Sequence, residues 1–131
     1  MISEVAKGIY TILKADATLM AAITEVYNVI AVQKAVLPYV TFGHLTDTPM
    51  GTFASPSAIE DTTWWVNVFS STGSKDAGDI SQLVQDVLDN ANLTVAGYTV
   101  LKCVREFIGS PLYDDETNIY QIPMRYRIWV E

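Results

Sequence analysis

The sequence predicts an α+β fold, a mostly antiparallel sheet of about five strands with helices packed on one face, in the order ααβββαββ. Two observations predict it. Apolar residues alternate with a period of two over 120–130, and one long amphipathic helix at about 74–90 separates two groups of strand-forming segments. Half of the 131 residues are hydrophobic, and no linker rich in Pro, Ser or Gly divides them. We therefore expect a single domain over residues 1–131.

Helices are predicted at the N-terminus. The first covers about Ser3–Ala15, with Ser3 as its N-cap and apolar residues at helical spacing on one face. Asp16 can cap a second, short helix that carries Leu19, Met20 and Ile23.

Three strands are expected next. The first covers 26–30, and the second covers 39–45, directly after Pro38, which is tolerated at the start of a strand. The third, about 61–70, is apolar on both faces and so should be covered on both, with Trp64, Val66 and Val68 on one face and Trp65 and Phe69 on the other. Residues 47–58 between them have the composition of a loop, and loops of this length are often functional.

The C-terminal half begins with the helix at 74–90, whose wet face is acidic. A strand follows from Tyr98 to about Phe107 and is interrupted by Gly109 and Pro111. Residues 114–118 form a turn. In the last strand, 120–130, the apolar face alternates with one that carries Gln121, Arg125 and Arg127.

Composition and charge exclude several classes of protein. The apolar content excludes disorder, and no uninterrupted apolar run approaches the roughly 18 residues of a membrane span, so we expect no membrane partner. The N-terminus shows no signal peptide. A net charge of −7 argues against binding the phosphate backbone as the main task. Low charge together with three Trp and seven Tyr indicates a surface that other subunits cover.

Catalytic motifs are missing, so the sequence predicts no enzyme, cofactor or metal site. There is no phosphate-binding loop, dinucleotide fingerprint, nucleophile elbow, C-x-x-C or H-E-x-x-H. His44, on the side of Val40 and Phe42, could be a general base, but a strand histidine with a local hydrogen bond is favoured. Cys103 is favoured as a buried small hydrophobe over a nucleophile. For the acids at 114–116, a solvated turn is favoured over a calcium site.

Most of the residues that favour assembly lie on the last two strands. Arg125 and Arg127 share one strand face, and Lys102 and Arg105 lie on the strand expected to pair with it. These cations could contact DNA phosphates, but carboxylates of a neighbouring subunit are the favoured partners. Trp65 and Trp129 lie off the main apolar face. The candidate subunit-interface residues are therefore Trp65, Lys102, Arg105, Arg125, Arg127 and Trp129.

The order of these segments resembles that of a known family. The N-terminal helix is followed by Asp16-Ala-Thr-Leu and Val26-Tyr27, by Gln33-Lys-Ala-Val-Leu-Pro38-Tyr39-Val40, and by Asp47-Thr-Pro49. After the aromatic strand and the acidic helix come Leu112-Tyr113-Asp114 and Thr117-Asn-Ile-Tyr120, then the Arg-bearing strand. Over nearly the whole chain this resembles the tail-completion family of long-tailed bacteriophages, also called tail terminator or tail-to-head joining proteins.

The resemblance implies a non-enzymatic subunit of a ring, usually a hexamer. The ring sits on the last layer of the tail tube, stops its growth and presents a surface to the head connector, while DNA passes through the centre without sequence-specific binding. The implied partners are other copies of the chain, the tail tube protein, the head–tail connector or stopper protein and the tape-measure protein. The implied location is the tail or neck of the virion, after assembly in the host cytoplasm.

Loops at the ends of the sheet are the expected axial contacts with tube and connector, because loops project from sheet ends. The candidates are Asp47, Pro49, Met50, Phe53, Pro56, Asp114, Asp115 and Glu116. Two other readings stay open. One is a different head–tail connector or neck component, and the other is a small α+β ligand-binding or regulatory domain, which would need a pocket with convergent polar groups.

Overall fold

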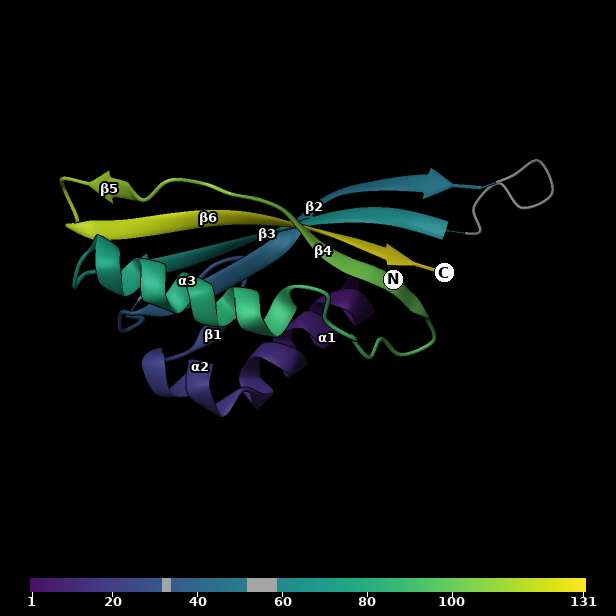
Figure 1. Cartoon of the computed structure of the whole chain (residues 1–131), viewed down its shortest axis with the longest axis horizontal. Coiled ribbons are helices and arrows are strands. Elements are labelled where there is room, and N and C mark those ends of the chain that lie inside the picture. The colour runs from purple at the N-terminus through teal and green to yellow at the C-terminus, as the bar shows by residue number, and fades with distance from the viewer. Residues whose placement is uncertain (32–33, 52–58) are drawn as a thin grey trace.

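The computed structural model describes residues 1–31, 34–51 and 59–131 (Figure 1). Within these residues, three helices and six strands make up an α+β fold, as predicted. In chain order they are α1 (Ile2–Ala15), α2 (Ala17–Ala22), β1 (Val26–Asn28), β2 (Tyr39–Met50), β3 (Ile59–Ser70), α3 (Ser74–Leu88), β4 (Val100–Ile108), β5 (Leu112–Asp114) and β6 (Ile119–Val130).

The strands form one sheet in the order β1-β2-β3-β6-β4, and β5 also pairs with β6. Among the described strands only β1 and β2 run parallel, so the sheet is mostly antiparallel, as expected. The predicted order lacked β5. This strand pairs with β6 at Leu112↔Gln121, on the edge where β4 pairs at Ile108↔Met124. Thus β4 and β5 are two parts of one outer edge, separated at 109–111.

All three helices lie on one face of the sheet, as Figure 1 shows. Alternate residues of β3 and β6 point toward the helices and are buried, among them Trp64, Val66, Met124 and Tyr126. They pack with buried residues of α1 and α3 such as Leu13 and Val84 in one core. Burying side chains of this size stabilises the fold by roughly 1.5–3 kcal/mol each.

The polar groups of the large core side chains are satisfied. The Trp64 indole donates from Nε1 to Thr62 Oγ1 at 2.9 Å, and the Thr62 hydroxyl donates to the Ile128 carbonyl at 2.7 Å. The Tyr126 hydroxyl donates to Asp89 Oδ1 at 2.7 Å, just after α3. Burial raises the pKa of Tyr126 far above its usual value. The phenol therefore stays a neutral donor, and this bond fixes the end of α3 on the sheet.

Helix caps were predicted with mixed success. The Asp16 carboxylate accepts from the backbone N–H groups of Thr18 and Leu19, as expected of the N-cap of α2. The prediction that Ser3 caps α1 was wrong, because α1 begins at Ile2 and Met1 is its N-cap. The N-terminal ammonium lies 2.6 Å from the Glu4 carboxylate, so the first turn is held by a charge pair instead.

Two strand boundaries also differ from the prediction. The first strand ends at Asn28 rather than at residue 30, because Val29 adopts a left-handed conformation with φ of 71°. The predicted loop at 47–58 was wrong at its start, since β2 continues to Met50 and pairs Pro49 with Glu60. Pro49 is tolerated because β1 pairs with β2 only from Val40 to Phe42, so this half of β2 is an outer edge.

Substitution of Gly8 tests how closely α1 packs against the backbone at Thr94. A Cβ on Gly8 would lie 2.9 Å from the Thr94 carbonyl oxygen. We expect Gly8→Ala to lower the free energy of unfolding by about 1–2 kcal/mol, because the clash with backbone outweighs the helix propensity of Ala. Gly78 of α3 has no atom within 4 Å of its Cβ position. Gly78→Ala, the matched control, should stabilise by up to about 1 kcal/mol. Urea unfolding measures both, and equal stabilisation by the two would contradict this packing.

Candidate assembly surfaces

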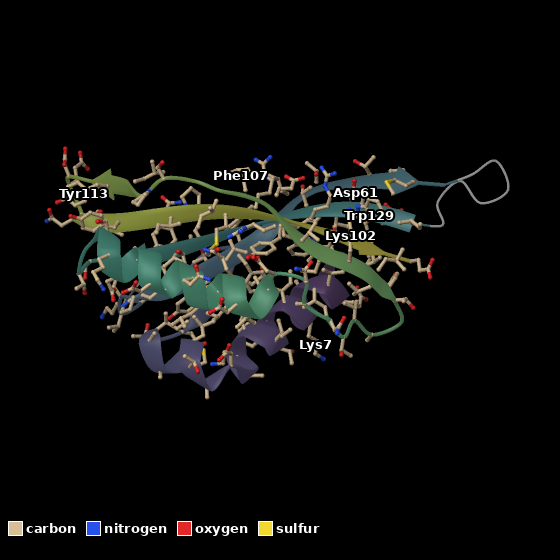
Figure 2. The ribbon with its side chains drawn as sticks, viewed as in Figure 1. Lys7, Asp61, Lys102, Phe107, Tyr113 and Trp129 are labelled. Atoms are coloured by element: carbon tan, nitrogen blue, oxygen red, sulfur yellow. The ribbon has the colours of Figure 1, made fainter. Side chains whose placement is uncertain are left out.

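No described helix covers the second face of the sheet, which we call the open face. Figure 2 shows Asp61 and Phe107 on this side, away from the helices. By cross-strand register the open face also carries Tyr39, Gly43, Trp65, Phe69, Lys102, Pro123, Arg125, Arg127 and Trp129. Glu106, at a bulge of β4, lies on the same side against Arg125 and Arg127. The expectation that strand 61–70 is covered on both faces was wrong within the described chain: Trp65 and Phe69 are only half-buried.

Aromatic rings on the open face lie against the sheet itself. Trp65 is paired with Gly43 across β2 and β3, and a Cβ on Gly43 would meet an indole carbon at 2.3 Å. The indole therefore lies flat over a position that only glycine leaves free. Tyr39 stacks on Phe69 with a centroid distance of 5.2 Å. This packing half-buries large rings without a second layer of structure.

The predicted basic residues are brought together in part. Arg127 lies 2.6 Å from the Glu106 carboxylate and 3.5 Å from that of Asp61, and Arg125 lies 3.9 Å from Glu106. The Lys102 ammonium lies 3.7 Å from the centre of the Trp129 ring. These pairs are partly exposed and contribute at most about 1 kcal/mol each. Two carboxylates of the chain thus sit among its three open-face cations.

Arg105 lies apart from the other cations, on the helix side of the sheet. It is paired with Tyr126 across β4 and β6, and its guanidinium lies 3.6 Å from Asp89 and hydrogen-bonds to Gln85. The sequence already indicated this separation, because Arg105 is three positions from Lys102 and residues at odd spacing on one strand point to opposite faces. Arg105 links β4 to the end of α3.

The candidate axial residues lie at two opposite ends of the sheet (Figure 1). Asp47 and Pro49 are exposed and Met50 half-buried near the end of β2, while Phe53 and Pro56 lie outside the described residues. At the other end, Asp114 closes β5, and Asp115 and Glu116 lie in the exposed turn to β6. The Asp114 carboxylate accepts from the backbone N–H of Glu116 at 3.0 Å, a turn-forming bond.

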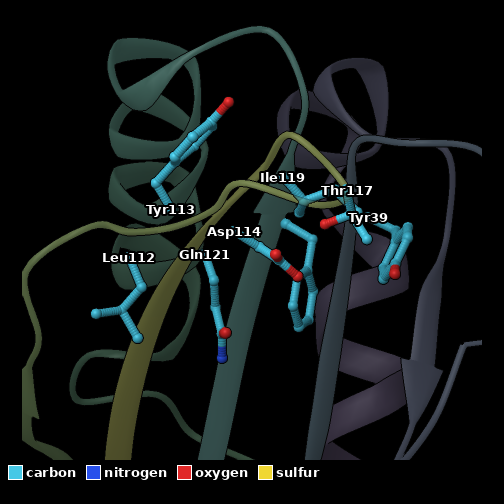
Figure 3. Close-up of a pocket in the computed structure, with 8 residues that line it drawn as sticks. Tyr39, Leu112, Tyr113, Asp114, Thr117, Ile119 and Gln121 are labelled. Carbon is cyan, nitrogen blue, oxygen red and sulfur yellow. The ribbon is translucent and has the colours of Figure 1, made fainter.

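Two hollows could be considered for a ligand. One, of about 270 Å³, lies beside the β5–β6 turn, where Gln121 and Asp114 lie between Leu112 and Tyr39 (Figure 3). Its volume is below the roughly 300–1,000 Å³ typical of ligand sites. The other, of about 500 Å³, lies between α1 and residues 94–96, where Glu4 is already paired with the N-terminal ammonium. Ser3, Lys7, Thr11 and Thr94 also line this second hollow, so polar side chains do gather there. A further hollow, of about 360 Å³, lies where Val29 and Ile30 approach Trp65 and Phe69.

The two residues weighed for chemistry lie on the helix side. His44 is half-buried and makes an edge-to-face contact with Trp64, at a centroid distance of 5.2 Å. The expected local hydrogen bond was wrong, since its Nε2 has no partner within the described residues. Cys103 is 1% exposed, as predicted for a small hydrophobe, and its thiol donates to the Leu88 carbonyl at 3.3 Å. Among the described residues, no group of three or more His, Cys, Asp or Glu could hold a metal ion. In the same part of the chain, no helix has both the length and the apolar character to cross a bilayer.

The buried position of Cys103 predicts that its thiol reacts more slowly in the native protein than in the unfolded chain. Burial raises the pKa of its thiol to about 12. At pH 8 only on the order of one thiol in 10,000 is then a thiolate, the form that attacks disulfide reagents. We expect Ellman's reagent to label the native protein at least roughly 1,000-fold more slowly than the urea-unfolded chain. Because the chain has one cysteine, the absorbance change reports this site alone. Equal rates in both states would contradict the buried position.

Gly43 predicts the position of the Trp65 indole. In Gly43→Ala the added methyl group must displace the ring, because it would lie 2.3 Å from it. We expect a red-shifted Trp65 emission and a loss of stability of about 1 kcal/mol. The signal of Trp65 is isolated by subtracting the spectrum of Trp65→Phe from that of its parent. Gly73→Ala, where the Cβ position is empty, is the control and should leave the emission unchanged.

Comparison with known proteins gives three findings. The model of the family described as "Tail completion protein gp17" matches residues 7–131. A chain in the virion of a native gene transfer agent particle is 21% identical, with a TM-score of 0.82, covering 94% of this chain and 91% of that one. The gp17 protein of bacteriophage SPP1 is 23% identical, with a TM-score of 0.65, covering 94% and 86%. No curated protein sequence matches.

Because the two solved structures share only 21% and 23% identity with this chain, they show a common fold and nothing more. The family match, in contrast, rests on the sequence itself. It spans everything from the middle of α1 to the C-terminus. The resemblance drawn from the order of segments is thereby confirmed. The chain belongs to the tail completion protein gp17 family of bacteriophages.

Proposed function

We propose that this chain is a structural virion protein that forms a ring on the end of the phage tail tube. The ring ends tube growth, provides the surface for head–tail joining and lets DNA pass through its lumen. Membership of the tail completion family carries this proposal. A similar fold in the virion of a gene transfer agent particle supports a place in a virion. The proposed location is the tail or neck of the particle, after assembly in the host cytoplasm. Residues 1–131 act as one tail-terminator-like domain.

The open face supports a role in lasting subunit contacts. Its half-buried rings, above all Trp65 and Trp129, are residue types enriched at interfaces. The Trp129 indole N–H has no hydrogen-bond partner within the described residues. Lys102 lies over that same ring and has no carboxylate within 4 Å in the described part of the chain. Carboxylates of a neighbouring subunit would give Lys102 an ion-pair partner and Arg125 a further one.

The two ends of the sheet support different axial partners. The β2–β3 end carries Asp47, Pro49 and Met50, with Phe53 and Pro56 beyond them in the sequence, and the β5–β6 end carries Asp114, Asp115 and Glu116. These sets differ in chemistry, one mixed and one strongly acidic. In a ring they would face opposite directions, one toward the tube protein and one toward the connector. Capping is then steric: one ring face mimics the tube subunit and the other does not.

The net negative charge of the chain supports a ring lumen that does not bind the DNA passing through it. The chain carries −7, and its open-face arginines have carboxylates of the chain beside them. Passing DNA would then find no array of free cations, and like charges repel it. The tape-measure protein is a further partner in the same lumen.

A tube-polymerisation assay tests capping. Tail tube protein should stop elongating at substoichiometric amounts of this chain, and electron microscopy should show shorter tubes with a ring at one end. Asp115→Lys, in the β5–β6 turn, should weaken one axial contact by roughly tenfold or more, because it reverses a charge at that contact. Asp86→Lys, on the exposed side of α3, is the matched charge reversal and should change neither contact.

Other outcomes separate the alternatives. Unchanged tube lengths together with no binding to tube ends would refute the capping role. Binding to the connector protein without binding to the tube would instead support another neck component. Thermal stabilisation by one small molecule, without binding to either virion protein, would support a ligand-binding domain.

A further inference from the structure

The hollow beside the β5–β6 turn lies on the open face, at one end of the sheet (Figure 3). One cross-strand row lines it, in the order Leu112, Gln121, Phe69 and Tyr39. Asp114 is two residues after Leu112 in β5, so its side chain lies on the same face of the sheet. Side chains of β5, β6, β3 and β2 therefore meet in this hollow.

Two aromatic rings in the hollow pack against each other. The ring centroids of Tyr39 and Phe69 lie 5.2 Å apart, and both residues are only half-buried. Partial burial raises the pKa of the Tyr39 phenol, so this ring stays neutral in ordinary buffers. An aromatic ring attracts a cation to its face, more strongly where water is partly excluded. In the described chain no Lys or Arg lies over either ring, so this attraction is unused.

A carboxylate and an amide lie beside these rings. Figure 3 shows the side chains of Asp114 and Gln121 next to each other in the hollow. One oxygen of Asp114 accepts the backbone N–H of Glu116 at 3.0 Å, which holds the carboxylate in place. Within the described residues no Lys or Arg nitrogen lies within 4 Å of this carboxylate. Its second oxygen and the Gln121 amide oxygen can therefore accept from a donor that enters the hollow.

The size of the hollow suits one side chain better than a small molecule. Its volume of about 270 Å³ is below the range of ordinary ligand sites. The hollow of about 360 Å³ near Trp65 adjoins it, because Tyr39 and Phe69 line both. A side chain that enters the first hollow can thus belong to a polypeptide that continues across the open face.

Arginine is the side chain that matches the rings, the carboxylate and the amide together. Its guanidinium is planar, stacks on aromatic rings and carries several N–H donors for carboxylate and amide oxygens. A lysine ammonium is a compact charge without that planar shape. The neighbouring Asp115 and Glu116 are exposed, and no Lys or Arg lines the hollow, so the local charge favours a cation.

The arginines of this chain are already engaged. The chain has three, and each has a carboxylate of the same chain within 4 Å. Arg105 lies beside Asp89, and Arg125 and Arg127 lie beside Glu106. A neighbouring copy would have to break one of these pairs to fill the hollow, whereas a different protein can supply a free arginine.

We propose that the hollow at the β5–β6 end binds an arginine side chain of a different protein, with its guanidinium stacked on the rings of Tyr39 and Phe69 and paired with Asp114. The place of that protein rests on the proposed function, which turns this end of the sheet toward an axial partner. The hollow adds the chemistry of recognition: the partner presents one arginine on a segment that crosses the open face.

Three small probes test the hollow in amide NMR spectra of the isotope-labelled whole chain. N-acetyl-arginine amide should shift the signals of Gln121 and Phe69 with a dissociation constant on the order of millimolar, as for one side chain. N-acetyl-citrulline amide, an uncharged analogue of the same shape, should bind at least roughly tenfold more weakly. N-acetyl-lysine amide should bind roughly threefold or more weakly, because its ammonium does not stack.

Substitutions test the named groups. Asp114→Asn should weaken binding of the arginine probe roughly tenfold or more, since the amide keeps an acceptor for the turn but removes the charge. Phe69→Leu removes one ring and should weaken binding roughly threefold. Asp86→Asn, at an exposed residue of α3 outside the hollow, is the matched control and should bind like the parent. Thermal melting verifies that each variant folds, and the comparison of probes on the parent requires no variant.

Several outcomes would overturn the inference. No shift at about 100 mM arginine probe, or equal binding of the citrulline or lysine analogue, would do so. So would unchanged binding to Asp114→Asn. If Asp114→Asn instead loses the oligomeric state of the parent, the hollow holds another copy of the chain and the inference also fails.

These outcomes are distinct from failure of the proposed function. A chain that caps tubes but does not bind the arginine probe overturns the arginine site alone. A chain that binds the probe but neither binds tube ends nor changes tube length refutes the capping role and leaves the arginine site in place.

Discussion

The antiparallel pair of β3 and β6 holds the rest of the molecule together. Its register runs without a shift from Glu60↔Val130 to Ser70↔Tyr120, and Trp64 lies directly opposite Tyr126. Because side chains alternate with a period of two, a slip of one residue between the strands would leave only one of these two rings facing the helices. The bonds from Trp64 to Thr62 and from Tyr126 to Asp89 are satisfied only in this register. All other strands then add to one side or the other of this pair, and the helices cover its inner face.

Because of the same alternation, half of the side chains of each strand lie on the open face, which no described helix covers. Three helices of 14, 6 and 15 residues cover one side of a sheet whose three longest strands have 12 residues each. Nothing of comparable size remains in the described chain for the second side. Its rings are accommodated locally instead, Trp65 over Gly43 and Trp129 under Lys102. The two residues with reactive side chains, His44 and Cys103, both lie toward the helices, so the outer surface is built from groups that pack and pair.

Periodicity predicted the long elements well and the short or irregular ones poorly. The alternation at 120–130 and the amphipathic pattern at 74–90 identified β6 and α3 because many residues repeat one signal. The strand β5 has three residues, too few for a period. The end of β2 was missed because Pro49 and small polar neighbours have turn composition, and only the absence of an outer partner lets them stay in a strand. The grouping of Lys102, Arg125 and Arg127 could be predicted, but not their partners Glu106 and Asp61, since strand pairing brings these together.

A free edge poses a problem that ring closure can solve. The outer backbone groups of β4 and of the second half of β2 have no strand partner in the described chain, and exposed apolar residues lie beside them. Such an edge invites uncontrolled pairing with other chains. The bulges of β2 and β4 and the ring of Pro49 disfavour continuous backbone pairing, which leaves side chains to choose the partner. In a closed head-to-tail ring every copy would use both edges at once, so no edge would remain for lateral growth. In the proposed ring, the two ends of the sheet would then be left for the tube protein and the connector.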